Sequence, residues 1–522
     1  MPKNTKIEIN AGFRRALELI EQEKKNVFIT GRAGTGKSTL LQYFRTKTKR
    51  KIVVLAPTGV AAINVGGQTI HSFFKFKPNI TAEKVKAKYQ KDDQKNIYRK
   101  IEAIVIDEIS MVRADLLDCV DKFMRLNGPN KEKPFGGVQL IFIGDLYQLP
   151  PVVTSSEKHI FSSHYASPYF FSARVFDRPD FELEFLELEK IYRQKDEKFI
   201  NLLNLIRNRT VVESDLKLLN QRLAPEFEPA KDDYYIYLTT TNDAADVINR
   251  EKLARLLGES QEFEAEIVGN FSREYFPTAQ TLELKAGAQV MMLSNDSLGR
   301  WVNGSIAKIL TFEENEFGTL DVMIQLENGE IEQVTPHTWD VYNFFLENGK
   351  LFSRSIGSFT QYPLRLAFAI TIHKSQGKTF DKAVIDIGRG TFAHGQMYVA
   401  LSRCRTLEGI VLKKEIKKSH IIMDWNVVKF VTSFQYRQAE KLLPLADKIA
   451  LIEKAIQEKQ TLKITYLKGK DEKSQRLIRP KKIAEMEFSG YLYLGLTAFC
   501  LARKEDRTFN VERILACEIE LD

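Results

Sequence analysis

The sequence lacks several features that would place it in a specialised class of proteins. None of its apolar runs approaches the roughly 18 residues of a membrane-spanning helix. The first residues, MPKNTKIEIN, carry neither the apolar stretch nor the small-residue cleavage site of a secretory signal. Only four cysteines are present, without C-x-x-C spacing, which disfavours a disulfide framework and a zinc knuckle: Cys119, Cys404, Cys500 and Cys517. We therefore expect a cytoplasmic protein with free thiols and no membrane partner.

The composition is that of an ordinary globular protein. The chain has 522 residues, 43% of them hydrophobic and 28% charged, and shows no internal repeat or low-complexity segment. At roughly 150 residues per domain, this length predicts three to four domains. The 77 Lys and Arg residues against 68 Asp and Glu give a net charge of +9, which is compatible with a nucleic-acid partner but does not establish one.

Two stretches alternate between strand-like and helix-like segments, residues 26–180 and then about 235–255 resuming at 366–412. Buried apolar runs such as NVFIT, IVVLAP, AIVIDE and QLIFIGD end in Gly, Pro or acidic residues. That pattern is typical of parallel strands whose C-terminal ends face a ligand crevice. The sequence therefore predicts two α/β layers.

Two further regions change character. Residues 285–365 read as short strands separated by turn residues, and Asn328-Gly329 is a strong hairpin signal, so we expect a small antiparallel barrel inserted in the second α/β layer. After Pro444 a helix with Ile449, Ile452 and Ile456 on one face precedes four strand-like runs. This last part is predicted to be a separate domain.

The strongest single motif is GRAGTGKS, which follows the strand NVFIT and opens the helix STLLQYF. In such a P-loop, backbone N–H groups surround the β-phosphate, Lys37 reaches the β and γ oxygens, and the Ser38 hydroxyl binds Mg²⁺. We therefore expect ATP and Mg²⁺ as cofactors. The residues predicted to hold the nucleotide here are Gly31, Ala33, Gly34, Thr35, Gly36, Lys37, Ser38 and Thr39.

Polar residues at later strand ends supply the remaining chemistry of hydrolysis. Asp107 is predicted to hold the magnesium and Glu108 to accept a proton from the attacking water. Gln148 follows another buried strand, where its amide can orient that water. Arg193 in IYRQ and Arg403 in YVALSRCR are candidate arginine fingers from the second layer, although a single helical arginine is more often a surface ion-pair partner.

Together these motifs resemble the Pif family of superfamily 1 DNA helicases, relatives of RecD. GRAGTGKS, APTGVAAINVGGQTIHSFF, IVIDEISMV, PFGGVQLIFIGDLYQLPPV, IYRQ, ITIHKSQGKTFD and YVALSRCRTLEG occur in the family's order over about residues 8–430. The resemblance implies an α/β fold with two RecA-like P-loop domains, at 1–180 and at 181–284 plus 366–430. It also implies an SH3-like β-barrel at 285–365 and a short wedge insertion after Thr69.

In function, the resemblance implies a monomeric ATP-dependent helicase that moves 5′ to 3′ on single-stranded DNA and opens duplexes at single-strand to double-strand junctions. Because the family acts in DNA replication, repair and recombination, the resemblance also implies a cytoplasmic protein associated with the bacterial nucleoid. Thr58 and His71 fall in DNA-contact motifs of the first domain, and His373 and Ser375 in one of the second. Gln376 and Gly377 are expected to couple that grip to the ATP cleft. For either histidine alone, a buried structural imidazole is an equally good interpretation.

One departure concerns the base. The family's adenine-reading Gln aligns with Arg14, or less well with Asn10, so the strictness of ATP over GTP stays open.

After a linker at 431–445, residues 446–522 resemble a WYL domain, although Leu492 replaces the Trp. Its arginines could bind single-stranded nucleic acid or a nucleotide-like ligand, or pair with local acids: Arg476, Arg479, Arg503, Arg507 and Arg513. The alternative function is an ATP-gated nucleic-acid clamp regulated by this domain.

Overall fold

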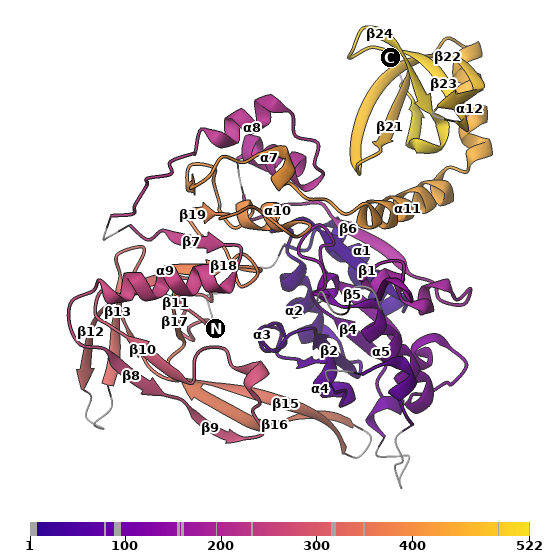
Figure 1. The fold of residues 1–522 in the computed structure, drawn as a ribbon. Helices are drawn as coiled ribbons and strands as arrows, with labels where there is room; N and C mark the ends of the chain where they lie inside the picture. The colour runs from indigo at the N-terminus through magenta and orange to yellow at the C-terminus, as the bar shows by residue number, and fades with distance from the viewer. Residues whose placement is uncertain are drawn as a thin grey trace. The chain divides into compact units, whose positions relative to one another are not determined.

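The computed structural model describes residues 8–77, 80–87, 96–153, 157, 161–194, 196–230, 233–314, 320–347, 350–488 and 490–520 (Figure 1). The chain forms two compact units. The larger comprises residues 1–206 and 211–422, and the smaller comprises 207–210 and 423–522. No helix in the described part of the chain is long and apolar enough to cross a membrane.

The first sheet of the larger unit is parallel and has the strand order β3-β2-β4-β5-β1-β6. The predicted apolar runs form its inner strands, which are buried because helices pack on the sheet. Its elements are α1 Ala11–Leu17, β1 Val27–Gly31, α2 Lys37–Lys47, β2 Ile52–Ala56, α3 Gly59–Asn64, β3 Gln68–Thr69, α4 Ile70–Phe74, β4 Ala103–Ile106, α5 Ala114–Asn127, β5 Gln139–Ile143 and β6 Glu184–Leu188. The wedge predicted after Thr69 includes residues 78–79 and 88–95, which lie outside the described residues.

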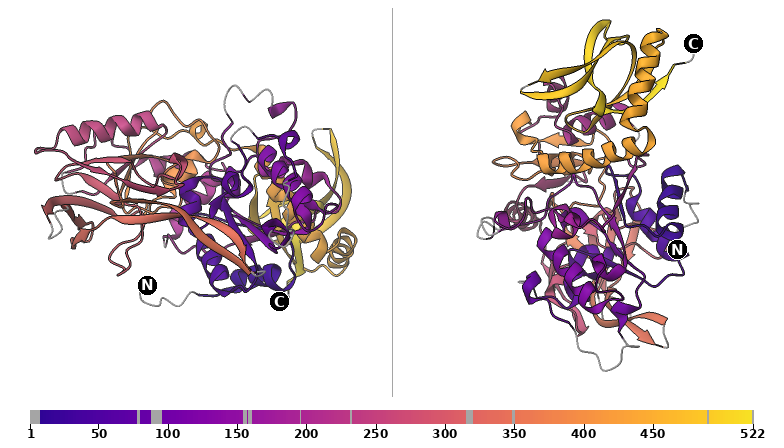
Figure 2. Two further views of the ribbon diagram at one scale, coloured as in Figure 1. Left: turned by 90° about the horizontal axis from the view of Figure 1, so that it is seen from below. Right: turned by 90° about the vertical axis from the view of Figure 1, so that its right-hand side faces the viewer.

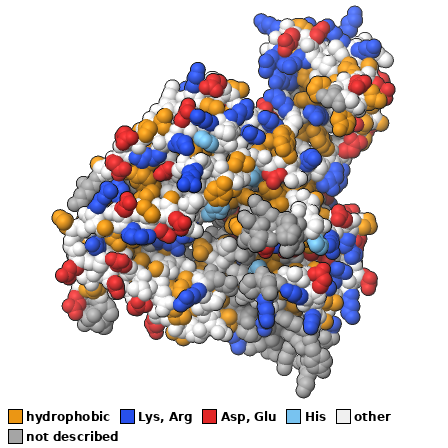
Figure 3. All heavy atoms as spheres, viewed as in Figure 1, with side chains coloured by type: hydrophobic (Ala, Val, Ile, Leu, Met, Phe, Trp, Pro, Cys, Tyr) orange, Lys and Arg blue, Asp and Glu red, His pale blue; other side chains and the backbone are white. Residues whose placement is uncertain are grey.

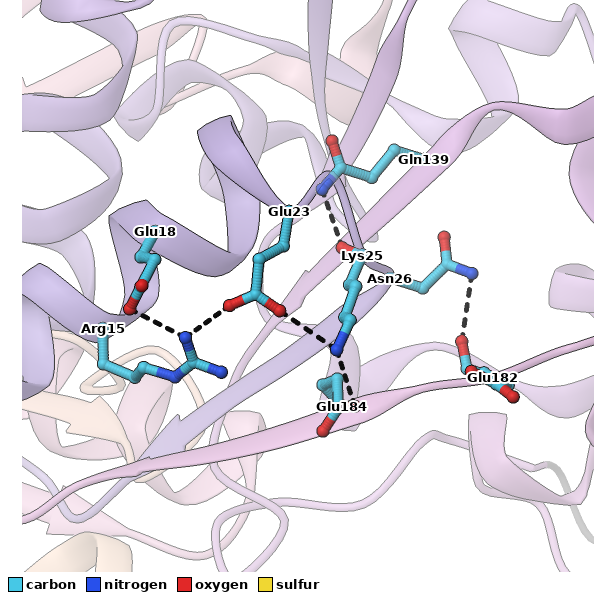
Figure 4. A network of polar contacts seen from close by, with 8 residues as sticks. All are labelled: Arg15, Glu18, Glu23, Lys25, Asn26, Gln139, Glu182 and Glu184. Carbon is cyan, nitrogen blue, oxygen red and sulfur yellow. Dashed lines mark hydrogen bonds and ion pairs between the residues drawn. The ribbon is translucent and has the colours of Figure 1, made fainter.

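A polar network ties the N-terminal helix to the edge of this sheet (Figure 4). Lys25 bridges Glu23 at 3.0 Å and Glu184 of β6 at 3.5 Å, and Glu23 also pairs with Arg15 of α1. Asn26 donates to the backbone oxygen of Glu182 at 3.1 Å. Exposed ion pairs of this kind stabilise a fold only weakly, so the network adds contacts between α1, the following turn and β6 but little stability.

The second sheet, β18-β7-β19-β20, is also parallel and confirms the second α/β layer. Its strands come from two distant chain segments, as the interrupted sequence pattern predicted. The elements are α7 Glu197–Arg207, α8 Glu213–Asn220, β7 Ile236–Thr239, α9 Asn242–Ala254, β18 Ala369–Thr371, β19 Ala383–Asp386, α10 Gln396–Leu401 and β20 Ile410–Leu412. A shared hydrophobic core joins α7, α10 and the strands.

Antiparallel strands occupy the region between these two segments. A five-stranded sheet, β14-β13-β12-β11-β17, encloses its own core, and the Asn328-Gly329 turn joins β13 to β14 as predicted. The antiparallel region starts before the predicted residue 285, and the long hairpin β15-β16 pairs with β9 outside the five-stranded sheet (Figures 1 and 2). The strands are β8 Gln261–Glu264, β9 Glu266–Gly269, β10 Thr281–Leu284, β11 Gln289–Met292, β12 Ile306–Glu314, β13 Leu320–Leu326, β14 Ile331–Val334, β15 His337–Glu347, β16 Lys350–Gln361 and β17 Leu364–Leu366.

The smaller unit contains the predicted C-terminal domain. Its helix α12, Leu445–Gln457, buries Ile452 against a five-stranded antiparallel sheet, with Ile449 and Ile456 packed at the edge of the same core. Helix α11, Trp425–Leu442, covers most of the segment predicted to be a linker. The strands are β21 Leu462–Lys468, β22 Glu472–Phe488, β23 Tyr491–Cys500, β24 Glu505–Asn510 and β25 Ile514–Ile519.

Candidate nucleotide site

A cavity of about 640 Å³ lies at the C-terminal ends of the first-sheet strands, where the second sheet contributes its own side chains. Binding crevices in parallel α/β sheets form at this edge. The structure brings the six predicted catalytic residues to this region. Five of them, together with P-loop and other residues, line the cavity: Glu8, Phe13, residues 33–39, Glu108, Gln148, Tyr192, Arg193, Gly377, Thr379, Arg403 and Arg405.

The P-loop has the backbone that the glycine pattern requires. Gly36 has φ +87° where α2 begins, a conformation that side chains rarely adopt. A Cβ at Gly34 would lie 2.5 Å from the Cβ of Arg193, so only glycine allows that segment to approach. The Lys37 ammonium donates to the carbonyls of Gly31 at 2.6 Å and Arg32 at 3.1 Å, and burial lowers its pKa.

Two carboxyls lie behind the P-loop at the end of β4. Burial raises the pKa of both Asp107 and Glu108, and the charge of Asp107 raises that of Glu108 further. Glu108 has a left-handed backbone, with φ 49°, which is strained for a residue with a side chain. Such a carboxyl is suited to accept a proton near neutral pH.

Two glutamine amides join the sheets across the cavity. Gln376 donates from Nε2 to Oε2 of Glu108 and to Oε1 of Gln148, both at 3.1 Å. Gln148 in turn donates to Oδ2 of Asp145 at 3.1 Å. The predicted base and the predicted water-orienting amide therefore share one donor, which lies in the turn after β18 of the second sheet.

The two arginines differ in how they are held. Arg193 donates to the carbonyl of Ser402 at 3.2 Å and reaches the cavity over Gly34. Arg403 is 1% exposed, and its guanidinium donates to the carbonyls of Val399, Ser375 and Lys378 and to the hydroxyl of Ser402. Burial, with Arg193 nearby, lowers the pKa of Arg403 to about 9.

Sequence reasoning missed three aromatic residues at this site. The backbone N–H of Ala33 donates to the hydroxyl of Tyr398 at 3.0 Å, which links α10 to the P-loop. Phe13 and Tyr192 line the cavity beside Gly36. The only signal for them was their position within or beside motifs, because aromatic residues of this type are usually core residues.

The two candidates for the adenine-reading position, Arg14 and Asn10, have different surroundings in the structure. Arg14 is not among the cavity-lining residues of the described chain. Asn10 uses its oxygen to cap α1, accepting from Phe13 N–H, and its nitrogen to donate to Tyr192 Oη at 2.9 Å. Both polar ends of this amide are thus occupied within the protein.

The four predicted DNA contacts lie in different environments. Thr58 is exposed and caps α3, and His71 is partly exposed on α4. The ring of His373 stacks near Phe392, and burial lowers its pKa. Ser375 is fully buried, and its hydroxyl donates to the carbonyl of Ile372 at 2.7 Å.

The residues present suit a magnesium ion beside the P-loop. Ser38 lines the cavity at the start of α2. When they are ionised, the buried carboxyls of Asp107 and Glu108 carry two negative charges, and Lys37 is the main cation near them. A hydroxyl with carboxylate oxygens is the donor set that Mg²⁺ prefers. Ser38 and Asp107 would hold the ion, which would neutralise phosphate charge.

A P-loop cavity shared by two parallel sheets defines a P-loop nucleotide-binding protein with two α/β domains. The chain matches the family model described as PIF1-like helicase over residues 8–216, and the WYL domain model over residues 447–519. It is 31% identical over 441 residues to the ATP-dependent DNA helicase Pif1 of Bdellovibrio bacteriovorus, covering 82% of this chain and 93% of that protein. The chain therefore belongs to the Pif1 helicase family.

Other relatives agree with this assignment. The ATP-dependent DNA helicase PIF1 of Homo sapiens is 36% identical over 397 residues, which span 74% of this chain and 58% of the human protein. The crystal structure of Bacteroides sp Pif1 in complex with ADP-AlF4 is 39% identical, with a TM-score of 0.76, and covers 83% of this chain and 98% of that chain. Bacteroides Pif1 bound to ssDNA is also 39% identical, covering 82% of this chain and 97% of that chain, with a TM-score of 0.59.

Proposed function

We propose that this protein is an ATP-dependent DNA helicase that moves 5′ to 3′ along single-stranded DNA and opens duplexes. The observation that carries the proposal is the shared amide of Gln376, which joins Glu108 and Gln148 of the first sheet to the second. Any change in the distance between the sheets must alter these hydrogen bonds. Hydrolysis and domain movement are therefore linked in one set of atoms.

In this proposal each side chain has one task. Lys37 leaves the carbonyls of the P-loop for the β and γ oxygens of ATP. Ser38 and Asp107 would hold Mg²⁺, which would supply neutralising charge beside the phosphates. Gln148 orients the attacking water, and Glu108 accepts its proton. Arg193, which follows β6 of the first sheet and donates to the carbonyl of Ser402, stabilises charge on the γ-phosphoryl group. Arg403 holds the carbonyls around Ser375 in place.

DNA binding is proposed on both motor domains. The exposed hydroxyl of Thr58 and the partly exposed rings of His71 and His373 suit contacts to DNA phosphates and sugars, which carry no sequence information. The five-stranded antiparallel sheet is proposed to be the SH3-like accessory element beside them. The chain is proposed to act as a monomer, as the family resemblance implies. The structure of Bacteroides Pif1 bound to ssDNA supports this choice of partner.

The C-terminal domain is proposed to bind single-stranded nucleic acid or a nucleotide-like ligand. Lys and Arg side chains gather along one side of it in Figure 3. Of the five arginines singled out from the sequence, only Arg507 forms an ion pair in the described chain, with Glu505 at 3.4 Å. The other four, Arg476, Arg479, Arg503 and Arg513, keep their guanidinium groups available for an anionic ligand.

The test is ATP hydrolysis and unwinding by the full chain. We expect single-stranded DNA to stimulate hydrolysis strongly, Lys37→Ala to abolish it, and a fork with only a 5′ tail to be opened. Hydrolysis that does not respond to DNA would argue against a helicase, and opening of only 3′-tailed forks would reverse the polarity. Directed movement is separated from an ATP-gated clamp by stopped-flow loss of a dye placed at either end of the strand.

A further inference from the structure

The short segment Arg207–Thr210 belongs to the smaller unit, although the chain on either side of it belongs to the larger one. Within the smaller unit, Arg207 Nη1 lies 3.6 Å from Asp471 Oδ2, and each side chain is 3% exposed. Asp471 occupies the turn between β21 and β22 of the C-terminal domain. A buried ion pair thus fixes this turn to the last residue of α7.

Further hydrogen bonds hold Asp471 in one position. Gln435 of α11 donates to its Oδ1 at 2.7 Å, and Asn208 donates to its backbone oxygen at 3.1 Å. Next to it, Lys470 donates to the carbonyl of Arg209 at 3.1 Å. Asp471 and Arg209 both have positive φ, at 54° and 51°, which side chains other than glycine adopt only when their surroundings enforce it.

A pair of this kind is a costly way to join two segments. Removing two charges from water is repaid only when geometry and additional hydrogen bonds are good, and apolar residues of similar size often stabilise a fold equally well. In several proteins the benefit of such a buried pair is a defined geometry, and the proposal below assigns that role to this one. The position of Arg207 is therefore set by atoms of the C-terminal domain.

The opposite end of α7 leads to the nucleotide cavity. The helix begins at Glu197, shortly after Arg193 and Gln194. Gln194 is buried and donates to the carbonyls of Ser402 at 3.2 Å and Cys404 at 3.1 Å. An 11-residue helix is a stiff element about 16 Å long at roughly 1.5 Å per residue, so a displacement at one end reaches the other.

We propose that Asp471 is a positioning residue for ATP hydrolysis: through its ion pair with Arg207 it fixes the end of α7, and thereby the placement of Arg193 at the cavity. A ligand on the C-terminal domain would then regulate turnover through this helix. The inference rests on the proposed function, in which Arg193 acts on the γ-phosphoryl group. Asp471 touches neither nucleotide nor DNA in this account.

The experiment compares Asp471→Asn with the parent full-length chain. The amide keeps an acceptor for Gln435 and removes the charge. We expect kcat with saturating single-stranded DNA to fall about 5- to 10-fold while KM for ATP stays within about 2-fold, because Arg193 acts in the transition state rather than on bound ATP. The matched control is Asp506→Asn, which removes an exposed pair with Lys481 of the same domain and should leave kcat unchanged.

Two further measurements distinguish positioning from simple stabilisation. The double variant Arg207→Met with Asp471→Leu replaces the charges by apolar contact, so we expect it to regain the parent Tm but not the parent kcat. Recovery of both would overturn the proposal. Backbone hydrogen exchange of residues 197–206 should be faster in Asp471→Asn than in the parent. This measurement needs neither DNA nor ATP hydrolysis. Unchanged exchange would therefore refute the coupling even if the proposed helicase activity is not found.

Discussion

Replacing Gln376 by leucine tests the link between hydrolysis and the second sheet. The change removes an N–H donor that lies 3.1 Å from both Glu108 and Gln148, while keeping the size of the side chain. A hydrogen bond to a charged group contributes about 1.5 to 3 kcal/mol. At roughly 1.36 kcal/mol per tenfold in rate, kcat should fall by about 10- to 150-fold.

The pH dependence of kcat in the Gln376→Leu variant gives a second test of the same hydrogen bond. The carboxylate of Glu108 must be unprotonated to act as a base, and its pKa is already raised by burial. Since a donated hydrogen bond favours the charged form, its loss raises that pKa further. The acidic limb of the kcat profile should therefore move to higher pH in the Gln376→Leu variant.

The assay is steady-state ATP hydrolysis with saturating single-stranded DNA across the neutral range. A matched control is Gln289→Leu, because Gln289 is buried and likewise donates to two acceptors, the backbone carbonyls of Tyr235 and Ala367 at 2.8 and 2.7 Å, outside the cavity. This control should lower Tm and leave the pH profile in place. If Gln376→Leu keeps its kcat within about 2-fold and its acidic limb unmoved, the shared amide does not link the sheets.

Three other predictions follow from the site. Arg193→Ala should lower kcat on the order of 10³-fold with little change in Tm. Arg403→Ala should lower both kcat and Tm, because four hydrogen bonds of a buried guanidinium are lost. Calorimetry alongside kinetics distinguishes the two variants. Tyr192→Ala should raise KM for ATP and GTP alike, since a ring stacks on either base; a rise for ATP alone would show base-specific contact. Tyr398→Phe removes only the hydroxyl that accepts from Ala33, so kcat should fall a few-fold at unchanged Tm, and a fully active variant would make this bond dispensable.

Much of the nucleotide site could be predicted because its chemistry requires short, ordered motifs at strand ends. The glycines of the P-loop, the acidic pair after β4 and Gln148 after β5 each follow a buried apolar run that the sequence displays directly. Parallel strands then bring these ends to one edge of the sheet. The same reasoning identified the C-terminal helix from its isoleucine spacing.

Other features depend on contacts between distant segments, which spacing does not report. Nothing local to Arg403 indicates that its guanidinium donates to the carbonyls of Ser375 and Lys378, because tertiary packing places those carbonyls. Similarly, the alignment that suggested Arg14 did not show that Asn10 caps α1 while bonding to Tyr192. The predicted linker is mostly helix because apolar residues such as Val427 and Val431 recur at helical spacing and are buried.

The hydrogen bonds of Lys37 to the carbonyls of Gly31 and Arg32 have a consequence for product release. An arriving nucleotide must compete with these carbonyls for the ammonium group. ATP offers oxygens on two phosphates within its reach, whereas ADP offers those of one. In the proposed cycle, the loop's own carbonyls would therefore regain the lysine more readily once phosphate has left, which would favour release of the spent nucleotide.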